Sequence, residues 1–190
     1  MADGTKQFIK GITFKSRADF VTDAYGPNAF GKLIPHLSGE LKAMVEDPVR
    51  VRPTAWYPFD YQQALDEAIY KVLASGDANV FRRMGAFSAD YENRNNLIKI
   101  FTDPWRFLNH QPTIWSRYFK PGSVDVIRVS DREAKVHLHS FRSSEANCQT
   151  NLGYFIRSIE ICGAEDVHVV ETQCTKDPGV EYCEFRIRWH

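Results

Sequence analysis

The sequence predicts an α+β fold, in which N-terminal helices pack on a four-stranded antiparallel sheet with the C-terminal order β-β-α-β-β. Apolar residues recur at helical spacing up to about residue 120, and the pattern changes to strand-like alternation after Pro121-Gly122. One amphipathic helix then interrupts the strands, which is typical of helices covering one face of an antiparallel sheet. We expect a single domain over residues 1–190, with a mainly helical part over 1–120 and the β-β-α-β-β part over 121–190.

The helical part begins after a short strand-like lead-in over residues 7–15. Its most regular helix covers residues 61–73, where apolar side chains follow the spacing i, i+3, i+4 and i+7. Asp60 suits the cap of this helix, and Gly76 suits its end. Further helices are expected over residues 77–91, 95–101, 105–109 and 113–119.

The C-terminal part alternates with a period of two, as half-buried strands do. In residues 181–189, Cys183 shares an apolar face with Phe185 and Ile187. Residues 166–172 carry valine on both faces, so the sequence leaves open which face is buried. The remaining strands are expected over residues 124–129 and 134–140, with a helix over 147–163 that is capped by Ser144 or Asn147.

Four residues of the C-terminal part have the chemistry of metal ligands: Cys148, Glu171, Cys174 and Cys183. Three thiols and a carboxylate form a closed tetrahedral set suited to Zn²⁺. Cys148 lies in the first turn of its helix, where the helix dipole favours a thiolate. Glu171 points to the core if the face that carries Val169 is the buried one, and a buried carboxylate needs a cation or several donors.

Two other interpretations of the cysteines remain open. Free cysteine packs as a small hydrophobe, and Cys162 fits that description within an apolar helix stripe. Pairing of the four cysteines in disulfides is the second alternative. No hydrophobic leader follows Met1, so we expect a cytoplasmic location, which favours metal ligands or free thiols over disulfides.

Several classes of function are not expected. The 24 basic and 24 acidic residues form no basic block, which argues against nucleic-acid binding. No apolar stretch approaches the ~20 residues that span a bilayer. The chain has no glycine-rich nucleotide motif, and no Ser, His and Asp arrangement follows from spacing. We therefore expect a protein that is not an enzyme.

The helical part is rich in aromatic residues, which make up 13% of the whole chain. Small-molecule sites are mostly apolar with a few polar groups, so a hydrophobic or aromatic ligand is expected between helices and sheet. The alternative is an aromatic-rich core. His110 suits either a tetrapyrrole ligand or a surface residue, and His137 with His139 suits either a metal or a solvated face. The candidate ligand-binding residues are Trp56, Tyr57, Phe101, Trp105, His110, Trp115 and Tyr118.

Three segments carry a resemblance to a known family. They are Cys148 with the following Gly153-Tyr154-Phe155, the run Val170-Glu171-Thr172-Gln173-Cys174, and Tyr182-Cys183-Glu184-Phe185. On these segments the C-terminal half resembles the 4-vinyl-reductase-type domain, which is related in fold to small subunits of TRAPP vesicle-tethering complexes. Through Trp56-Tyr57-Pro58 and Trp115-Ser116-Arg117-Tyr118-Phe119, the whole chain also resembles a bacterial paralogous family carrying that domain.

The resemblance implies a structural zinc held by Cys148, Glu171, Cys174 and Cys183, together with a homodimer and a TRAPP-like arrangement. It leaves two expected functions. The first is a sensor or carrier that binds a small hydrophobic or aromatic molecule. The alternative is a dimeric interaction module that docks a signalling protein or a small GTPase. A co-purifying ligand would favour the first function, and a stable dimer with a filled core the second.

Overall fold

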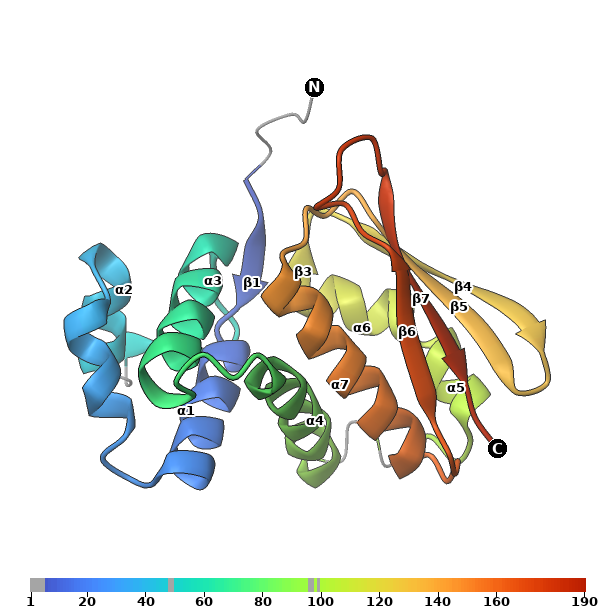
Figure 1. Cartoon of the computed structure of the whole chain (residues 1–190), viewed down its shortest axis with the longest axis horizontal. Helices are drawn as coiled ribbons and strands as arrows, with labels where there is room; N and C mark the ends of the chain where they lie inside the picture. Colours follow the sequence, from blue (N-terminus) through green and yellow to red (C-terminus); the bar gives the residue numbers. More distant parts are fainter. Residues whose placement is uncertain (1–5, 48–49, 96–97, 99) are drawn as a thin grey trace.

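The computed structural model describes residues 6–47, 50–95, 98 and 100–190 (Figure 1). Its helices are α1 Ile12–Tyr25, α2 Gly39–Glu46, α3 Phe59–Ala68, α4 Asn79–Arg94, α5 Pro104–Asn109, α6 Gln111–Tyr118 and α7 Glu145–Ile161, with the short turns η1 Phe30–His36 and η3 Ile69–Leu73. Its strands are β1 Phe8–Lys10, β2 Trp56–Pro58, β3 Phe119–Lys120, β4 Ser123–Ser130, β5 Glu133–His139, β6 His168–Gln173 and β7 Tyr182–Arg188.

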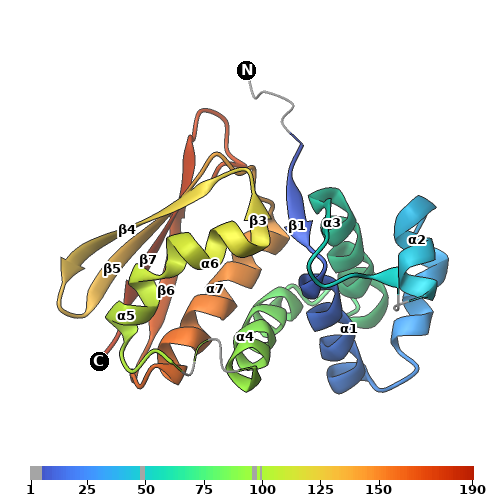
Figure 2. The ribbon, with the colours of Figure 1, turned by 180° about the vertical axis from the view of Figure 1, so that it is seen from behind.

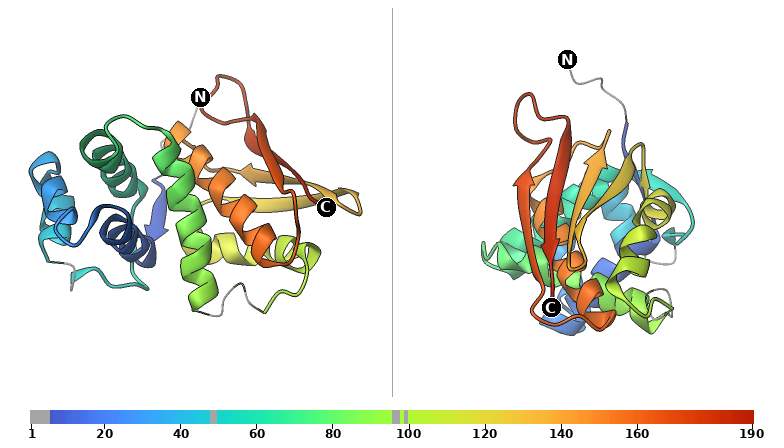
Figure 3. Two further views of the ribbon diagram at one scale, coloured as in Figure 1. Left: turned by 60° about the horizontal axis from the view of Figure 1, so that its bottom comes forward. Right: turned by 90° about the vertical axis from the view of Figure 1, so that its right-hand side faces the viewer.

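The large sheet has the order β4-β5-β7-β6, and every neighbouring pair is antiparallel. The view onto its right-hand side shows the strands in front and the helices behind them (Figure 3, right). Val136, Leu138 and Phe185 are buried on the face toward the helices, whereas Val170 on the other face is 53% exposed. The predicted α+β class and the order β-β-α-β-β are therefore confirmed.

A second, smaller sheet of order β2-β1-β3 was not predicted. Its central strand pairs Ile9 with Tyr57 on one side and with Phe119 on the other. Seen from behind, β1 and β3 lie between the N-terminal helices and the large sheet (Figure 2). Strands of two or three residues are too short to show a period of two, which explains why no periodic signal marks β2 and β3 in the sequence.

The strongest predicted helix exists, with different ends. It begins at Phe59 directly after Pro58, so Asp60 lies in its first turn and does not cap it. After Ala68 the chain widens into the π-helical turn η3, and Gly76 follows with a positive φ of 83°. The expected helix over 95–101 lies partly outside the described residues. The segment Met1–Thr5, which was considered for a leader, lies wholly outside them. No helix of the described residues has both the length and the apolar character to cross a membrane.

Helices α4 and α7 pack along each other with their backbones in close approach (Figure 3, left). A Cβ added to Gly85 on α4 would lie 1.9 Å from the Thr150 carbonyl oxygen on α7. A Cβ added to Gly153 on α7 would lie 2.0 Å from the Arg82 carbonyl oxygen on α4. Only glycine fits at both positions, so these two residues set the distance between the two helices.

Buried apolar residues of the helical part and of the sheet part belong to one contiguous core. Phe59 from α3 packs edge-on against Phe141, which follows β5, at 4.8 Å between ring centroids. This shared core accords with one domain over residues 1–190, which stays a prediction.

Candidate functional site

A cavity of about 190 Å³ lies between the helical part and the large sheet. Its walls come from α1, α4, α6 and α7, and Val124 and Leu138 of the large sheet close one side. An apolar cavity of about 150 Å³ is enough to hold a benzene ring. The space therefore suits a ligand of one or two rings.

The charged group on the α1 wall is already balanced. The Arg17 Nε donates to Asp66 Oδ1 at 2.8 Å, and its Nη1 donates to Ser88 Oγ at 3.2 Å. The Gln62 amide also donates to Asp66, at 2.9 Å. The Arg17 and Asp66 side chains are 7% and 6% exposed, so this is a buried and well-bonded ion pair. It presents little net charge to the cavity.

The α4 wall contributes a carboxyl group that is unusually hard to ionise. Burial is the main reason that the pKa of Glu92 rises to about 7, although hydrogen bonds from Tyr154 and Tyr118 oppose this rise. The Tyr154 hydroxyl donates to Glu92 Oε2 at 2.8 Å. Burial, and then the nearby Glu92, raise the pKa of both tyrosines above the ordinary value. Both phenols are therefore neutral at physiological pH.

Other polar groups on the α6 and α7 walls have no hydrogen-bond partner among the described residues. They are Gln111 Nε2 and Trp115 Nε1 on α6, and Thr150 Oγ1 and Asn151 Nδ2 on α7. Gln111 and Trp115 are only 4% and 6% exposed. A buried polar group without a partner is energetically costly. These four atoms have almost no accessible surface, so they lie within the walls and not on the face of the cavity.

Only two of the predicted ligand-binding residues line the cavity, namely Trp115 and Tyr118. Trp56 packs under the ammonium groups of Lys10 and Lys120. Tyr57 accepts a hydrogen bond through its hydroxyl from the Arg52 backbone N–H at 3.0 Å, and so it fixes the loop before β2.

The other three predicted residues form a cluster around α5. Phe101 is buried against Phe107, and the Trp105 Nε1 donates to the Asp131 carbonyl oxygen at 2.7 Å. His110 is exposed, and its Nδ1 lies 2.9 Å from the Arg106 carbonyl oxygen. Phe101 and Trp105 therefore serve packing, as the aromatic-core alternative expected, and His110 lies at the surface, as its second interpretation expected.

The sequence reasoning missed the polar residues of the cavity. Gln111 and Trp115 are four residues apart and so lie on one face of α6, which is a signal that the sequence contained. Arg17, Glu92 and Asn151 gave no such signal, because a charged or amide residue in a helix usually faces solvent.

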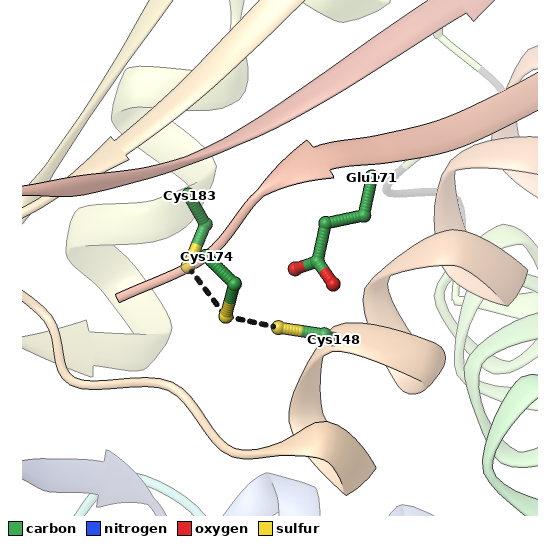
Figure 4. Close-up of side chains that lie close together, drawn as sticks. All are labelled: Cys148, Glu171, Cys174 and Cys183. Carbon is green, nitrogen blue, oxygen red and sulfur yellow. Dashed lines mark hydrogen bonds between the residues drawn. The ribbon is translucent and has the colours of Figure 1, made fainter. Parts of the chain in front are cut away.

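The four predicted metal ligands converge at one end of the sheet (Figure 4). Their ligand atoms all lie within 4.8 Å of one another. The Cys174 Sγ lies 3.1 Å from the Cys148 Sγ and 3.3 Å from the Cys183 Sγ. A tetrahedral ion with metal–sulfur bonds of about 2.3 Å separates its sulfurs by roughly 3.7 Å, so a small opening would accommodate it. All four cysteines of the chain are free, and Cys162 is buried outside this cluster.

Local structure explains the convergence. The Ser144 Oγ caps α7 by accepting from the Asn147 backbone N–H, which puts Cys148 in the first turn as predicted. On β6, Val169 is 8% exposed and Val170 is 53% exposed, so the face that carries Glu171 is the inward one. A register irregularity between Glu171 and Gln173 then bends the strand end.

The thiols of the cluster have shifted pKa values, and its carboxylate lacks a full set of partners. The hydrogen bond with Cys148 is the main cause that lowers the pKa of Cys183 to about 6, and the same contact raises the pKa of Cys148. Burial raises the pKa of Cys174 to about 12. The Glu171 Oε1 has no partner among the described residues, and the Lys176 Nζ lies 3.7 Å from its Oε2. A cation at this place would satisfy the carboxylate and the thiols together.

The histidine pair of β5 belongs to the open face of the sheet. The His137 Nε2 lies 2.7 Å from Glu184 Oε2, and the Lys135 Nζ also contacts this carboxylate. The His139 Nε2 lies 3.2 Å from Asp125 Oδ2. The pair therefore contacts carboxylates on the outer face of the sheet, where the His137 side chain is only 12% exposed.

Comparison with known proteins shows what this fold resembles. No family model matches the chain, and no curated protein matches it. Among solved structures, the unliganded Fe(II) H-NOX protein of K. algicida has a TM-score of 0.71 at 16% identity, over 96% of this chain and 97% of that one. The H-NOX protein of S. oneidensis in its Fe(II)NO state has a TM-score of 0.72 at 14% identity, over 96% and 99%. A structure on the modulation of haem redox potential through porphyrin distortion has a TM-score of 0.71 at 15% identity, over 95% of this chain and 99% of that one.

These likenesses correct the predicted family. The resemblance to the 4-vinyl-reductase-type domain and to TRAPP subunits was wrong, because the whole chain superimposes on H-NOX domains. Zinc as the cofactor is overturned as well, since those neighbours are described with iron or haem. The expected homodimer loses the resemblance on which it rested.

Haem does not fit the cavity of this chain. Haem iron is held by His, Cys, Met or Tyr, and no histidine, cysteine or methionine is among the described residues that line the cavity. Tyr91, Tyr118 and Tyr154 are the tyrosines among the described lining residues, and the last two already form hydrogen bonds with Glu92. About 190 Å³ is also little room for four linked pyrrole rings. The chain thus shares the fold of the H-NOX domains, but the cavity formed by its described residues suits neither the ligation nor the size of their cofactor.

Proposed function

We propose that this chain is a non-enzymatic sensor-type domain that binds a small hydrophobic or aromatic molecule directly in its central cavity, without haem. The observation that carries the proposal is the cavity of about 190 Å³ between the helices and the sheet, with walls that are mostly apolar. Largely apolar walls with a few placed polar groups are typical of small-molecule sites.

The fold supports this proposal over the interaction module. The H-NOX structures to which the chain is similar are described by ligation states and not by a reaction. The docking alternative rested on TRAPP subunits, to which the structure gives no likeness.

Haem titration tests the first half of the proposal. Haemin added to the purified protein is expected to give no stoichiometric complex, because the described residues that line the cavity include no histidine, cysteine or methionine. The measurement is the Soret absorbance at increasing haemin, with reduced and carbon monoxide-treated samples. A saturable one-to-one complex with a single axial-ligand spectrum would contradict the proposal.

Binding of an apolar two-ring probe tests the second half. Tetralin is expected to bind at one site per chain and to raise the melting temperature, because it binds the folded state alone. Val124→Phe fills the cavity and should abolish binding, whereas Val126→Phe, two residues along the same strand and outside the lining, should retain it. Calorimetry and thermal unfolding give both readouts. Equal binding by both variants would place the probe elsewhere on the molecule.

A second proposal concerns the cluster of Cys148, Glu171, Cys174 and Cys183. We propose that these four residues hold one divalent metal ion that braces the end of the sheet. Three thiolates favour a soft or borderline ion, and four protein ligands leave no open position for catalysis. The unpartnered Glu171 Oε1 and the convergence of all four ligand atoms support this role.

Elemental analysis of the purified chain across the first-row metals tests the cluster. About one metal ion per chain is expected, and Cys174→Ser should reduce it to background. Cys162→Ser is the matched control, because that thiol is equally buried but outside the cluster. Removal of the ion by a chelator should lower the free energy of unfolding by about 4 kcal/mol, if the free metal concentration is normally about a thousand times the Kd of the site. Background metal in both the wild type and Cys162→Ser would mean that the cluster is a group of buried thiols.

A further inference from the structure

Glu92 is the acidic residue of the cavity lining within the described part of the chain. Its carboxyl group contacts two phenols, the Tyr154 hydroxyl, which donates to Oε2 at 2.8 Å, and the Tyr118 hydroxyl. An ionised carboxylate accepts about four hydrogen bonds, so two phenols leave places for further donors. These phenols therefore supply only part of the partners that an ionised Glu92 needs.

The Glu92 carboxyl group differs from the unpartnered polar atoms of α6 and α7. Those atoms are covered within the walls, whereas no Glu92 oxygen is among the covered atoms that lack a partner in the described residues. The Glu92 side chain is also half-buried, and it belongs to the lining of the cavity. It can therefore meet a molecule in the cavity without a rearrangement of the walls.

The charges of the cavity lining favour a cation. Arg17 is the basic lining residue among those that the structure describes, and its Nε donates to Asp66 at 2.8 Å, so its charge is already balanced. The remaining charge of this lining is the negative charge that Glu92 carries when it is ionised. A cation on the ligand would compensate for a carboxylate that burial makes costly, whereas an anion would be repelled by it.

The aromatic rings of the lining suit the same kind of ligand. Six aromatic side chains line the cavity: Tyr91, Trp115, Tyr118, Phe119, Tyr154 and Phe155. The faces of aromatic rings attract an ammonium group, and more strongly where water is excluded. Such rings also pack well against an apolar ring of a ligand. A carboxylate together with several aromatic rings is thus a combination suited to an amine.

The stability that Glu92 costs the folded protein also supports a role in binding. Burial is the main reason that the pKa of Glu92 rises to about 7, so its ionisation disfavours the folded state as pH increases. Glutamine would fill the same space without this cost. Groups whose titration is perturbed at the expense of stability are concentrated at binding and active sites.

We propose that the cavity takes a cationic amine carried on one or two apolar rings, with its ammonium group bound to the Glu92 carboxylate and its rings packed against the aromatic lining. This inference rests on the proposed function, since it names the chemical class of ligand that the same cavity takes. The ammonium group donates to the carboxylate oxygens in a charge-assisted hydrogen bond. The phenols of Tyr154 and Tyr118 hold the carboxylate in place from α7 and α6.

Four probes that share one ring frame separate amines from rival classes of ligand. They are 1-aminotetralin, tetralin, 1-tetralone and tetralin-1-carboxylate, compared by calorimetry at pH 8, where Glu92 is mostly ionised. We expect the amine to bind about tenfold more tightly than tetralin, as one hydrogen bond to a charged group allows. Tightest binding of the ketone would overturn the inference and show that the walls donate a hydrogen bond to the ligand. Tightest binding of the carboxylate would overturn it as well.

The variant Glu92→Gln locates the preference at the named carboxylate. It removes the charge and keeps the size, so it should reduce the preference for the amine to about twofold or less and leave tetralin binding nearly unchanged. Glu181→Gln is the control, because Glu181 is exposed and lies outside the lining.

The outcomes separate this inference from the proposed function. A tenfold preference for the amine that persists in Glu92→Gln would overturn the assignment to this residue. If the wild type binds tetralin without any preference for the amine, the inference fails and the proposed function stands. If no probe binds, both fail.

Discussion

Gly153→Ala is expected to destabilise the protein by about 3 kcal/mol or more, and to abolish folding if the wild type is only marginally stable. The added methyl would lie 2.0 Å from a backbone oxygen of α4, which no side-chain movement relieves. The helices would have to separate, and the packing along their whole contact would loosen. Urea unfolding followed by circular dichroism measures the loss.

A matched glycine gives the control for this change. Gly31→Ala introduces the same methyl in a helical turn at a position with nothing within 4 Å. It should be neutral or slightly stabilising, by up to about 1 kcal/mol, because alanine restricts the unfolded chain. Gly85→Ala should behave like Gly153→Ala, since its methyl would lie 1.9 Å from the Thr150 oxygen. Similar midpoints for the variants at positions 31 and 153 would contradict the close approach of α4 and α7.

Glu92→Gln is expected to stabilise the protein at alkaline pH by about 2–3 kcal/mol. The pKa of Glu92 is about 7 in the folded protein, against an ordinary value of 4.5. Because the folded state holds the proton more tightly, the contribution of Glu92 is complete below about pH 4.5 and is lost as pH rises through about 7. Glutamine resembles the protonated acid at every pH and has no such loss.

The difference in the free energy of unfolding between the wild type and Glu92→Gln should therefore depend on pH. Urea unfolding should give a small difference in stability between the wild type and Glu92→Gln at pH 5. At pH 8.5 the full stabilisation of Glu92→Gln should appear. Glu181→Gln, at an exposed position, is the control and should show neither. A constant difference at both pH values would mean that Glu92 titrates normally, and that its burial does not perturb it.

The sequence predicted the regular elements well and the shortest ones poorly. The strands around Cys183 and Val136 and the helix behind Ser144 follow clear periodic patterns, because each buries one face. Strands β2 and β3 hold too few residues to display a period, and they form through pairing with β1. The π-helical turn after Ala68 depends on tertiary packing, which spacing along the chain does not encode.

Of the two candidate sites, the metal-type cluster was predicted from the sequence and most residues of the cavity were not. The four metal-type residues were found because their chemistry is distinctive. Cys148, Glu171 and Cys183 lie at predictable phases of a helix or strand, and Cys174 directly follows β6. The cavity was expected in the right layer, between helices and sheet, but five of the seven aromatic residues proposed for it lie elsewhere. Aromatic residues fill cores as readily as they line cavities, whereas the informative groups are buried amides such as Gln111 and Asn151. Their burial is a property of the assembled fold.

The small sheet pairs an N-terminal strand with a strand near residue 120, and this separation affects when the sheet can form during synthesis and folding. Ile9 pairs with Tyr57 and with Phe119, so β1 can pair with β2 early but with β3 only after most of the helical part has been synthesised. The cavity walls also require α7, which ends at Ile161. Contacts between such distant residues carry a large loop-closure entropy and form late in folding. A chain that ended before Asn147 would lack the α7 wall, and the cavity would be open on that side.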